Sequence, residues 1–457
     1  MNRRRQLRSG PLLTPPQLFV LSFAVLVLAG ATGLKIIPGI YTGQPLNWLD
    51  ALFISTSAVC VTGLSVVDPA TVFTTAGQAF VLLLIQLGGL GMLTFTSLII
   101  LALGGRLSLR QESVSIVAED TSSHIDRRRL TLDIVRFTLA FEAAGTVALY
   151  LIWAPEMGWS DALWPAIFHS VSAFCNAGFS TFSDSLIGFQ ESPLTLLVIM
   201  LLIVAGGLGF LTHEECYLTV ISKFRRQAFR MSLQSRVVLM TTILLVVSGW
   251  APLAMLEWDN TLRHLPPAHR LTNSLFMSVT SRTAGFNSID YGRATDSSNL
   301  VTILLMTVGG SPGSTAGGLK TTTFALIGIL AWSRLRGLEA TNCFGRSVPE
   351  DTTSRAVGLF VISSAVLAAG VFGLTTTEMS SGVPGSLIHR MFEAVSAFNT
   401  VGLSMGITSS LSPPGRCITI ILMFFGRVGL LTLAASLTRR RTPEHVFRYA
   451  YEDVVVG

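Results

Sequence analysis

A short phrase around a single glycine occurs four times in this sequence. It reads SAVCVTGLS at Gly63, SAFCNAGFS at Gly178, TSRTAGFNS at Gly285 and SAFNTVGLS at Gly402. The glycines follow one another at intervals of 107 to 117 residues. Glycine lets the backbone adopt unusual dihedral angles and approach other backbone closely, and rings of backbone carbonyl oxygens can replace the hydration shell of a cation. Four such loops in one chain therefore predict a coordination site for a dehydrated ion.

The residues before each glycine are small or β-branched, so they bring little bulk to a central axis. We predict an ion-binding filter made of Val61, Thr62, Gly63, Asn176, Ala177, Gly178, Thr283, Ala284, Gly285, Thr400, Val401 and Gly402. The four phrases contain no acidic residue, which favours a monovalent cation such as K⁺. Each phrase is shorter than the TVGYG loop of tetrameric K⁺ channels, so we expect fewer ion sites. The alternative is that these glycines serve only helix packing, and the flanking residues shared by the four phrases disfavour it.

A glycine-rich stretch in the third quarter of the chain predicts a gate. It reads GGSPGSTAGGLKTTT from Gly309 to Thr323, and a helix cannot run uninterrupted through so many glycines and a proline. Flexible polar backbone just below the filter loops would lie across the ion path. The predicted gate residues are Gly309, Gly310, Ser311, Pro312, Gly313, Ser314, Thr315, Ala316, Gly317, Gly318, Lys320 and Arg427. A phosphate-binding loop is rejected because Leu319 separates Gly318 from Lys320 and no soluble strand precedes the stretch.

Arg427 lies within an apolar run, at the position that Gly89, Gly207 and Gly310 occupy in the other quarters. An ionisable residue at membrane depth suggests a function. Arg427 could hold the glycine-rich stretch through its backbone carbonyls or limit cation occupancy below the filter, and a purely structural buried charge is the alternative. Arg282 is expected to brace the half-length helix beside it, because a cation facing the ion would repel it.

The sequence gives little support for an enzyme. Its five cysteines form no CxxC pair, and Cys60 and Cys175 are expected to be packing residues behind the loops. His213-Glu214-Glu215 is not an HExxH motif, so a solvated or partner-facing patch is expected there. We therefore expect no catalytic residues and no cofactor in this chain.

The elements that must position the loops are membrane helices. Half of the 457 residues are hydrophobic and 13% are charged, whereas a soluble domain has about a quarter charged. Apolar runs of about 20 residues are long enough to cross a bilayer. The runs are Leu18–Gly33, Ala76–Leu103, Leu194–Ile221, Val237–Leu256, Ala356–Leu374 and Ile418–Leu437. The first run has no clear cleavage site after it, so it is expected to be a retained span.

Each quarter has the same order of segments: a long apolar segment, a short loop, a half-length segment ending in the glycine phrase, and a second long apolar segment. Ten helical residues rise about 15 Å, so a half-length segment can only re-enter the membrane. The half-length segments are Ala51–Cys60, Ala166–Cys175, Asn273–Ser281 and Arg390–Phe398. The expected fold is an all-α polytopic membrane protein with eight transmembrane helices. Its four tandem repeats, residues 1–105, 106–222, 223–333 and 334–457, would surround a pseudo-fourfold pore.

The net charge of +6 does not indicate nucleic-acid binding, because the basic residues occupy alternate loops. Lys and Arg are absent from Pro38–Asp50 and Ala154–Pro165. This distribution follows the positive-inside rule and predicts that both termini are cytoplasmic. The basic segments contain Arg3, Arg4, Arg5, Arg8, Arg106, Arg110, Arg127–Arg129, Lys223, Arg225, Arg226, Arg230, Arg236, Arg334, Arg336, Arg346, Arg355, Arg439–Arg441 and Arg448.

The chain resembles the Trk/Ktr/HKT superfamily of K⁺ transporters, and in particular the membrane subunits of bacterial Ktr systems. The resemblance runs nearly end to end. It includes TPPQ at Thr14–Gln17, the phrases VTGLSVVD, NAGFS, SRTAGFNS and TVGLSMGIT, and the helical segments IQLGGLGMLTF and GRVGLLTL. It implies that the four phrase glycines select the ion, that Gly309–Lys320 is an intramembrane gating loop, and that Arg427 faces it.

The same resemblance implies K⁺ uptake across a bacterial plasma membrane by a homodimer with one pore per subunit. It also implies a cytoplasmic ring of RCK-type regulatory subunits that bind ATP or ADP. A coupled cation symporter with a broken-helix binding site is the alternative, and Na⁺ dependence of transport stays open.

Overall fold

The computed structural model describes residues 15–102, 127–226, 229–338 and 340–437. The arginines from Arg3 to Arg8, the loop residues Arg106 and Arg110, and the basic residues from Arg439 onward lie outside the described residues. The predicted cytoplasmic position of both termini therefore falls outside them too.

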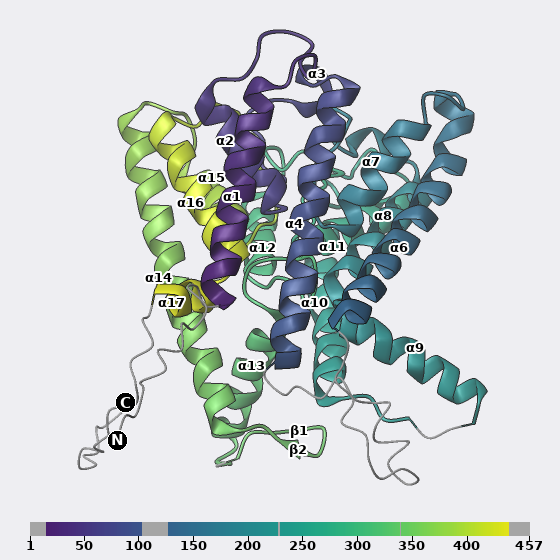
Figure 1. The fold of residues 1–457 in the computed structure, drawn as a ribbon, viewed down its shortest axis with the longest axis vertical. Helices are drawn as coiled ribbons and strands as arrows, with labels where there is room; N and C mark the ends of the chain where they lie inside the picture. Colours follow the sequence, from purple (N-terminus) through teal and green to yellow (C-terminus); the bar gives the residue numbers. More distant parts are fainter. Residues whose placement is uncertain (1–14, 103–126, 227–228, 339, 438–457) are drawn as a thin grey trace, which may run out of the picture.

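Four long helices begin the four quarters of the chain, and a half-length helix packs on each of them (Figure 1). The long helices are α1 (Pro15–Ile36), α6 (Arg127–Met157), α10 (Leu233–Glu257) and α14 (Glu350–Ser380). The half-length helices are α2 (Trp48–Val59), α7 (Leu163–Phe174), α11 (Pro267–Thr280) and α15 (Leu387–Phe398). Each half-length helix thus starts three to six residues before the start of the predicted segment, and it ends at the predicted last residue or one residue earlier.

A serine on three of the half-length helices fixes its position against the long helix. Ser55 Oγ donates to Val27 O at 2.6 Å, Ser170 Oγ to Glu142 O at 2.6 Å, and Ser278 Oγ to Val246 O at 2.8 Å. Each accepting residue precedes a glycine by three positions, and a Cβ on that glycine would collide with the serine hydroxyl. The separation would be 2.4 Å at Gly30, 2.5 Å at Gly145 and 2.5 Å at Gly249.

The second helices of the quarters differ in how they continue. The first, α4 (Thr75–Ala102), runs unbroken. The second breaks at Gly209 between α8 (Pro193–Leu208) and α9 (Phe210–Phe224), which meet at 105°. The fourth breaks at Gly429 between α16 (Pro413–Val428) and α17 (Leu430–Leu437). Both glycines have positive φ, 80° and 81°, which favours glycine. The sequence predicted neither break.

The third quarter has the break that the sequence predicted. Helix α12 (Asp296–Met306) ends before the glycine-rich stretch, and α13 (Thr321–Leu335) begins after it. Residues 307–320 between these helices form no regular element, which confirms that Pro312 and its neighbouring glycines interrupt the helix.

In three of the four quarters, an in-register glycine of the second helix has a common contact. A Cβ on Gly88 would lie 2.0 Å from Val59 O, on Gly206 1.9 Å from Phe174 O, and on Gly426 1.7 Å from Phe398 O. Each of these carbonyl oxygens belongs to the last residue of a half-length helix. Only glycine permits this approach, which explains the nearly constant spacing between these glycines and the filter phrases.

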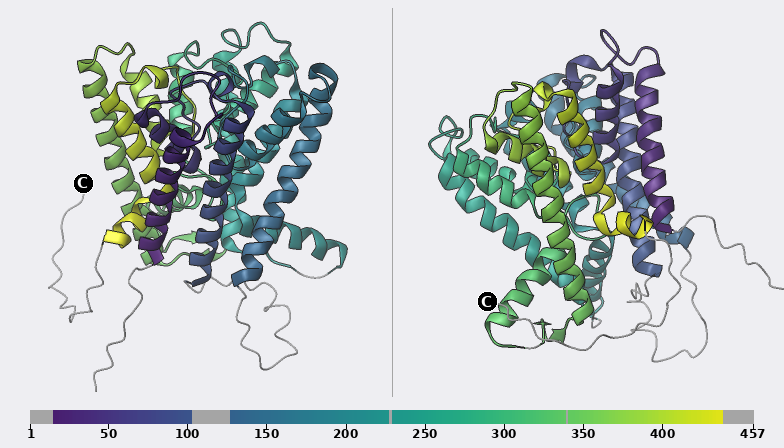
Figure 2. Two further views of the ribbon diagram at one scale, coloured as in Figure 1. Left: turned by 45° about the horizontal axis from the view of Figure 1, so that its top comes forward. Right: turned by 90° about the vertical axis from the view of Figure 1, so that its left-hand side faces the viewer.

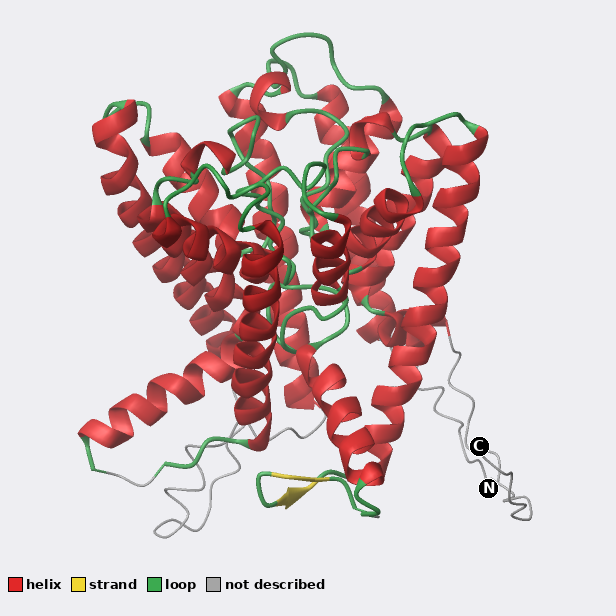
Figure 3. Ribbon diagram, turned by 180° about the vertical axis from the view of Figure 1, so that it is seen from behind, coloured by secondary structure: helices red, strands yellow, loops and turns green. Residues whose placement is uncertain are grey.

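Contacts between quarters follow the order of the chain. Helix α4 packs on α7, α8 on α11, α12 on α15, and α16 on α2, so the last quarter meets the first. The loops that follow the half-length helices gather in the middle of the molecule (Figure 3).

Five described helices are long and apolar enough to cross a membrane, and six if the bent pair α8–α9 is one span. The expected count of eight would need α12–α13 and α16–α17 as well, and it stays a prediction. Large apolar side chains such as Leu28, Ile243 and Phe372 are exposed on the long helices, while serines and threonines of the half-length helices are buried. This inverted pattern suits a lipid-facing surface around a polar interior.

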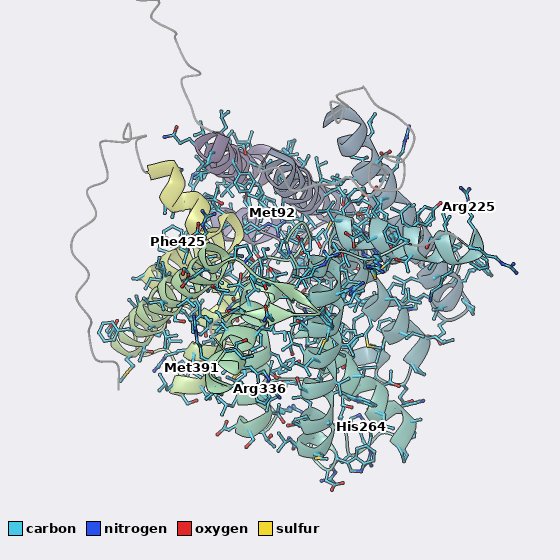
Figure 4. The ribbon with its side chains drawn as sticks, turned by 90° about the horizontal axis from the view of Figure 1, so that it is seen from below. Met92, Arg225, His264, Arg336, Met391 and Phe425 are labelled. Carbon is cyan, nitrogen blue, oxygen red and sulfur yellow. The ribbon has the colours of Figure 1, made fainter. Side chains whose placement is uncertain are left out.

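The remaining short elements lie at the two ends of the molecule. Helix α9 runs away from the bundle near the end where the hairpin of β1 (Asn342–Cys343) and β2 (Arg346–Ser347) lies, and α3 (Pro69–Val72) lies at the opposite end (Figures 1 and 2). Arg225, just past α9, projects outward from the bundle (Figure 4). Two 3₁₀ turns, Ile187–Phe189 and Thr408–Ser410, follow the second and fourth filter phrases.

Candidate ion pathway

The four phrase glycines lie against one another in the order of the chain. A Cβ added to any of them would collide with a backbone carbonyl oxygen of the next loop. The approaches are 2.5 Å from Gly63 to Ala177 O, 2.8 Å from Gly178 to Ala284 O, 2.6 Å from Gly285 to Val401 O, and 2.1 Å from Gly402 to Thr62 O. The fourth loop therefore contacts the first, and the structure brings the predicted filter residues together in a closed ring.

The backbone conformation is the same in the four loops. The residue two positions before each glycine has a left-handed φ: 56° at Val61, 59° at Asn176, 66° at Thr283 and 51° at Thr400. The glycines themselves have φ of 96°, 68°, 80° and 94°. A left-handed conformation is unfavourable for β-branched residues and costs about 1–3 kcal/mol. The surrounding contacts must therefore hold these loops in place.

Those contacts come from hydroxyl-bearing residues of the half-length helices. In the first loop, Thr62 N donates a hydrogen bond to Ser57 O at 2.8 Å, and Gly63 N donates to Ser57 Oγ at 3.1 Å. In the fourth loop, Val401 N donates to Ser396 O at 2.8 Å, and Gly402 N donates to Ser396 Oγ at 3.0 Å. In the second and third loops the hydroxyl instead donates to a carbonyl just after the glycine: Ser172 to Phe179 O at 2.8 Å, and Thr280 to Phe286 O at 2.5 Å.

Several backbone amides of the loops are hydrogen-bonded, but within the described part of the chain the backbone carbonyls of the predicted filter residues are not. Among the described residues, none donates a hydrogen bond to the backbone oxygen of any predicted filter residue. Thr62, Ala177, Ala284 and Val401 are nevertheless completely buried, backbone included. Buried carbonyls are almost always paired, so this ring of unpaired oxygens is suited to binding a dehydrated cation.

The glycine-rich stretch contacts both the filter and the broken helices. Ser311 N donates to Gly207 O at 3.0 Å, Thr315 N to Gly206 O at 3.2 Å, and Gly318 N to Gly426 O at 3.2 Å. A Cβ on Gly317 would lie 2.2 Å from Thr400 Oγ1 of the fourth loop. The stretch is thus held between α8 and α16 and touches the filter directly.

Comparison with known proteins decides the family. A family model described as TrkH, a cation transport protein, matches residues 17–445. The chain is 38% identical over 445 residues to the Ktr system potassium uptake protein B of Vibrio alginolyticus, covering 97% of this chain and 95% of that protein. It is 37% identical over 446 residues to the protein of the same name from Bacillus subtilis, covering 97% of each. The chain belongs to the TrkH family of cation transport proteins.

The fold is also that of the family. The structure superposes on the potassium transporter TrkH from Vibrio parahaemolyticus with a TM-score of 0.74, covering 96% of this chain and 87% of that one at 20% identity. The family model and the full-length relatives confirm the resemblance to the Trk/Ktr superfamily noted from the sequence.

In this TrkH-family chain, the three basic residues near the glycine-rich stretch all donate to its backbone. Arg427 is completely buried, and its Nη1 donates to Thr315 O while its Nη2 donates to Gly88 O at 2.9 Å. Lys320 Nζ donates to Ala316 O at 2.7 Å. Arg282 Nη2 donates to Gly309 O at 3.4 Å. Arg282 therefore contacts the glycine-rich stretch, whereas it was expected to brace the half-length helix beside it.

His213, Glu215, Cys60 and Cys175 all lie in the protein interior or against it. The expected solvated or partner-facing patch at His213-Glu214-Glu215 is wrong for two of its residues, which bond inside the protein. His213 packs on Phe137 and bonds Ala205 O at 2.6 Å, and Glu215 is buried and accepts Ser232 N at 2.8 Å. Cys60 and Cys175 are buried, as expected of packing residues.

Sequence reasoning missed two buried polar residues beside the filter, His169 and Glu393. Each follows the phenylalanine that every half-length helix carries, and each is completely buried. The signal was present in the sequence, because an ionisable residue in a re-entrant apolar segment is unusual.

Proposed function

We propose that this chain is the ion-conducting subunit of a bacterial potassium uptake system. The observation that carries the proposal is the closed ring of buried filter carbonyls without hydrogen-bond donors among the described residues. K⁺ would exchange its water for these oxygens, and the loops would hold them at fixed positions. The full-length relatives are named potassium uptake proteins, which supports K⁺ as the ion.

The order of contacts supports a pore surrounded by four repeats with eight membrane crossings. In that arrangement α12–α13 and α16–α17 each form one interrupted crossing. We further propose that Gly309–Lys320, held by Arg427, forms the gate below the filter. Its contact with Thr400 supports this role, because a movement of the stretch would reach the filter.

The charges of the described loops support an orientation. Exposed Lys223, Arg225 and Arg226 end α9, and exposed Arg334 and Arg336 end α13. We propose that this end faces the cytoplasm of a bacterial plasma membrane. The word "system" in the relatives' names supports partner subunits. We propose a homodimer bound on this face by a ring of RCK-type subunits that bind ATP or ADP, with no cofactor in this chain itself.

The test is K⁺ and Na⁺ flux into liposomes that contain the purified chain, with and without the regulatory subunits. Gly285→Asp should abolish K⁺-selective flux, because its side chain would collide with Val401 O. Gly43→Asp is the matched control, because a Cβ at this exposed loop glycine meets no atom within 4 Å. Unchanged K⁺ uptake in a folded Gly285→Asp protein would refute the filter. Flux that requires a second ion at fixed stoichiometry would favour the symporter.

A further inference from the structure

The segment just after each filter glycine has two alternating hydrogen-bond arrangements around the ring. The residue two positions after the glycine is Ser65, Ser180, Asn287 or Ser404. In the first loop Ser65 Oγ donates to Val67 O, and in the third Asn287 Nδ2 donates to Ile289 O at 3.1 Å. These two side chains therefore bond within their own loops.

The second and fourth loops reverse this arrangement. Ser180 Oγ accepts Phe182 N at 2.9 Å, and Ser404 Oγ accepts Gly406 N at 3.0 Å. Each hydroxyl also bonds the half-length helix of its own quarter. Ser180 Oγ lies 2.8 Å from His169 Nε2, and Ser404 Oγ donates to Glu393 Oε2 at 2.9 Å.

The direction of the His169 bond follows from its other nitrogen. His169 Nδ1 lies 2.8 Å from Pro165 O, and a carbonyl oxygen can only accept, so Nδ1 carries the hydrogen. In the neutral ring Nε2 is then an acceptor, and Ser180 donates to it. Glu393 is likewise an acceptor, and its Oε1 also accepts Thr408 Oγ1 at 2.5 Å.

The same helix position is apolar in the other two quarters. The residue after the shared phenylalanine is Ile54 in the first quarter and Met277 in the third, and both are completely buried. Because the loops contact one another in chain order, the second and fourth are diagonally opposite. At the position two residues after the glycine, the side chain therefore bonds a helix side chain in two opposite loops, and in the other two it bonds only its own loop.

We infer that His169 and Glu393 are positioning residues for ion selectivity, which act through Ser180 and Ser404 to fix two opposite filter loops. The inference rests on the proposed K⁺ filter. Only one residue separates each serine from its filter glycine, so loss of the bond frees the backbone beside the coordinating carbonyls. A filter whose oxygens can move fits Na⁺ as well as K⁺, so discrimination falls.

The experiment compares the same substitution at three equivalent serines: Ser180→Ala, Ser404→Ala and Ser65→Ala. Flux into liposomes is measured for K⁺ and Na⁺ over a range of concentrations. We expect Ser180→Ala and Ser404→Ala to lower the K⁺/Na⁺ flux ratio about tenfold, as the loss of one hydrogen bond implies. The KM for K⁺ should rise while the maximal rate is kept. Ser65→Ala should retain the wild-type ratio.

The helix side of the bond in the fourth loop is tested separately. Glu393→Met introduces the residue of the third quarter and should reproduce Ser404→Ala, whereas Glu393→Gln keeps an acceptor and should restore the ratio. Wild-type K⁺/Na⁺ ratios in Ser180→Ala and Ser404→Ala, or an equal loss in Ser65→Ala, would overturn the inference. If Glu393→Met does not fold, the serine variants still decide.

Gly402→Asp separates this inference from the proposed function. Loss of K⁺-selective flux in Gly402→Asp together with unchanged serine variants would reject the positioning role alone. The filter itself would be rejected if the wild-type protein showed no K⁺ preference, or if the Gly402→Asp variant kept that preference.

Discussion

At the residue scale, the filter loops combine a strained backbone with side chains that stiffen it. Val61, Thr283 and Thr400 are β-branched, yet each adopts a left-handed φ. Natural sequences usually place glycine or asparagine at such positions, as this chain does at Asn176. A β-branched residue restricts the loop to few conformations, which suits carbonyls that must keep fixed distances from an ion.

This strain can be tested at Thr283, where φ is 66°. Thr283→Gly should relieve about 1 kcal/mol of backbone strain and raise the thermal unfolding midpoint. It should also lower the K⁺/Na⁺ flux ratio, because the loop loses its stiffness. Ser409→Gly, at an exposed residue outside the filter, is the control and should lower stability slightly. A less stable Thr283→Gly protein would show that the left-handed backbone is not strained.

At the element scale, similar glycine motifs produce different helices. The motif Gly88-Gly89-Leu90-Gly91 lies inside the continuous helix α4, whereas Gly209 and Gly429, at the place of Gly91, end α8 and α16. Gly209 lies against the glycine-rich stretch, since a Cβ there would be 2.9 Å from both Pro312 O and Gly313 O. Gly429 has open space, with Thr432 Oγ1 at 4.0 Å as the nearest atom.

The two break glycines therefore form a matched pair for mutation. Gly209→Ala and Gly429→Ala share the cost of a positive φ, about 1 kcal/mol each. Only Gly209→Ala should also displace the glycine-rich stretch and change K⁺ flux. Flux and unfolding temperature measured on both variants separate the two effects. Equal flux changes in both would mean that contact with the stretch does not matter.

The same elements show what the sequence could and could not predict. The half-length helices and the interruption near Pro312 were predictable because their causes are local: short apolar length, and glycine with proline. The breaks at Gly209 and Gly429 were not, since a similar local motif remains helical in α4. The four glycine loops that meet in the ring could be recognised from repetition, but the left-handed backbone and the bonds of His169 and Glu393 depend on contacts between loop and helix.

At the scale of the whole molecule, contacts between the first and last quarters bring the two ends of the described chain together. Helix α16 packs on α2, and α17 packs on α1. Arg416 of α16 forms an ion pair with Asp50 of α2, and the side chains are only 18% and 14% exposed. Arg416 also donates to Leu411 O at 2.9 Å, so the pair is fixed on the α16 side.

Asp50→Asn should weaken this junction and lower the free energy of unfolding by about 1 kcal/mol, because the pair is shielded from solvent. Asp259→Asn is the control. Asp259 pairs with Arg270 at 3.6 Å but is 92% exposed, so its loss should change stability little. Unfolding of both variants in detergent provides the comparison. Similar losses in the two proteins would indicate that the junction between first and last quarters contributes no special stability.

The closed order of loop contacts also has a consequence for biosynthesis. A chain emerging from the ribosome inserts its N-terminal quarters first. Until the loop at Gly402 arrives, the loops at Gly63 and Gly285 each lack a neighbour in the ring. A prematurely terminated chain that ends before this loop has an incomplete ring of oxygens, and under the proposed function it would lack a selective passage. Under the proposed function, potassium conduction therefore begins only after the loop at Gly402 has been translated and inserted.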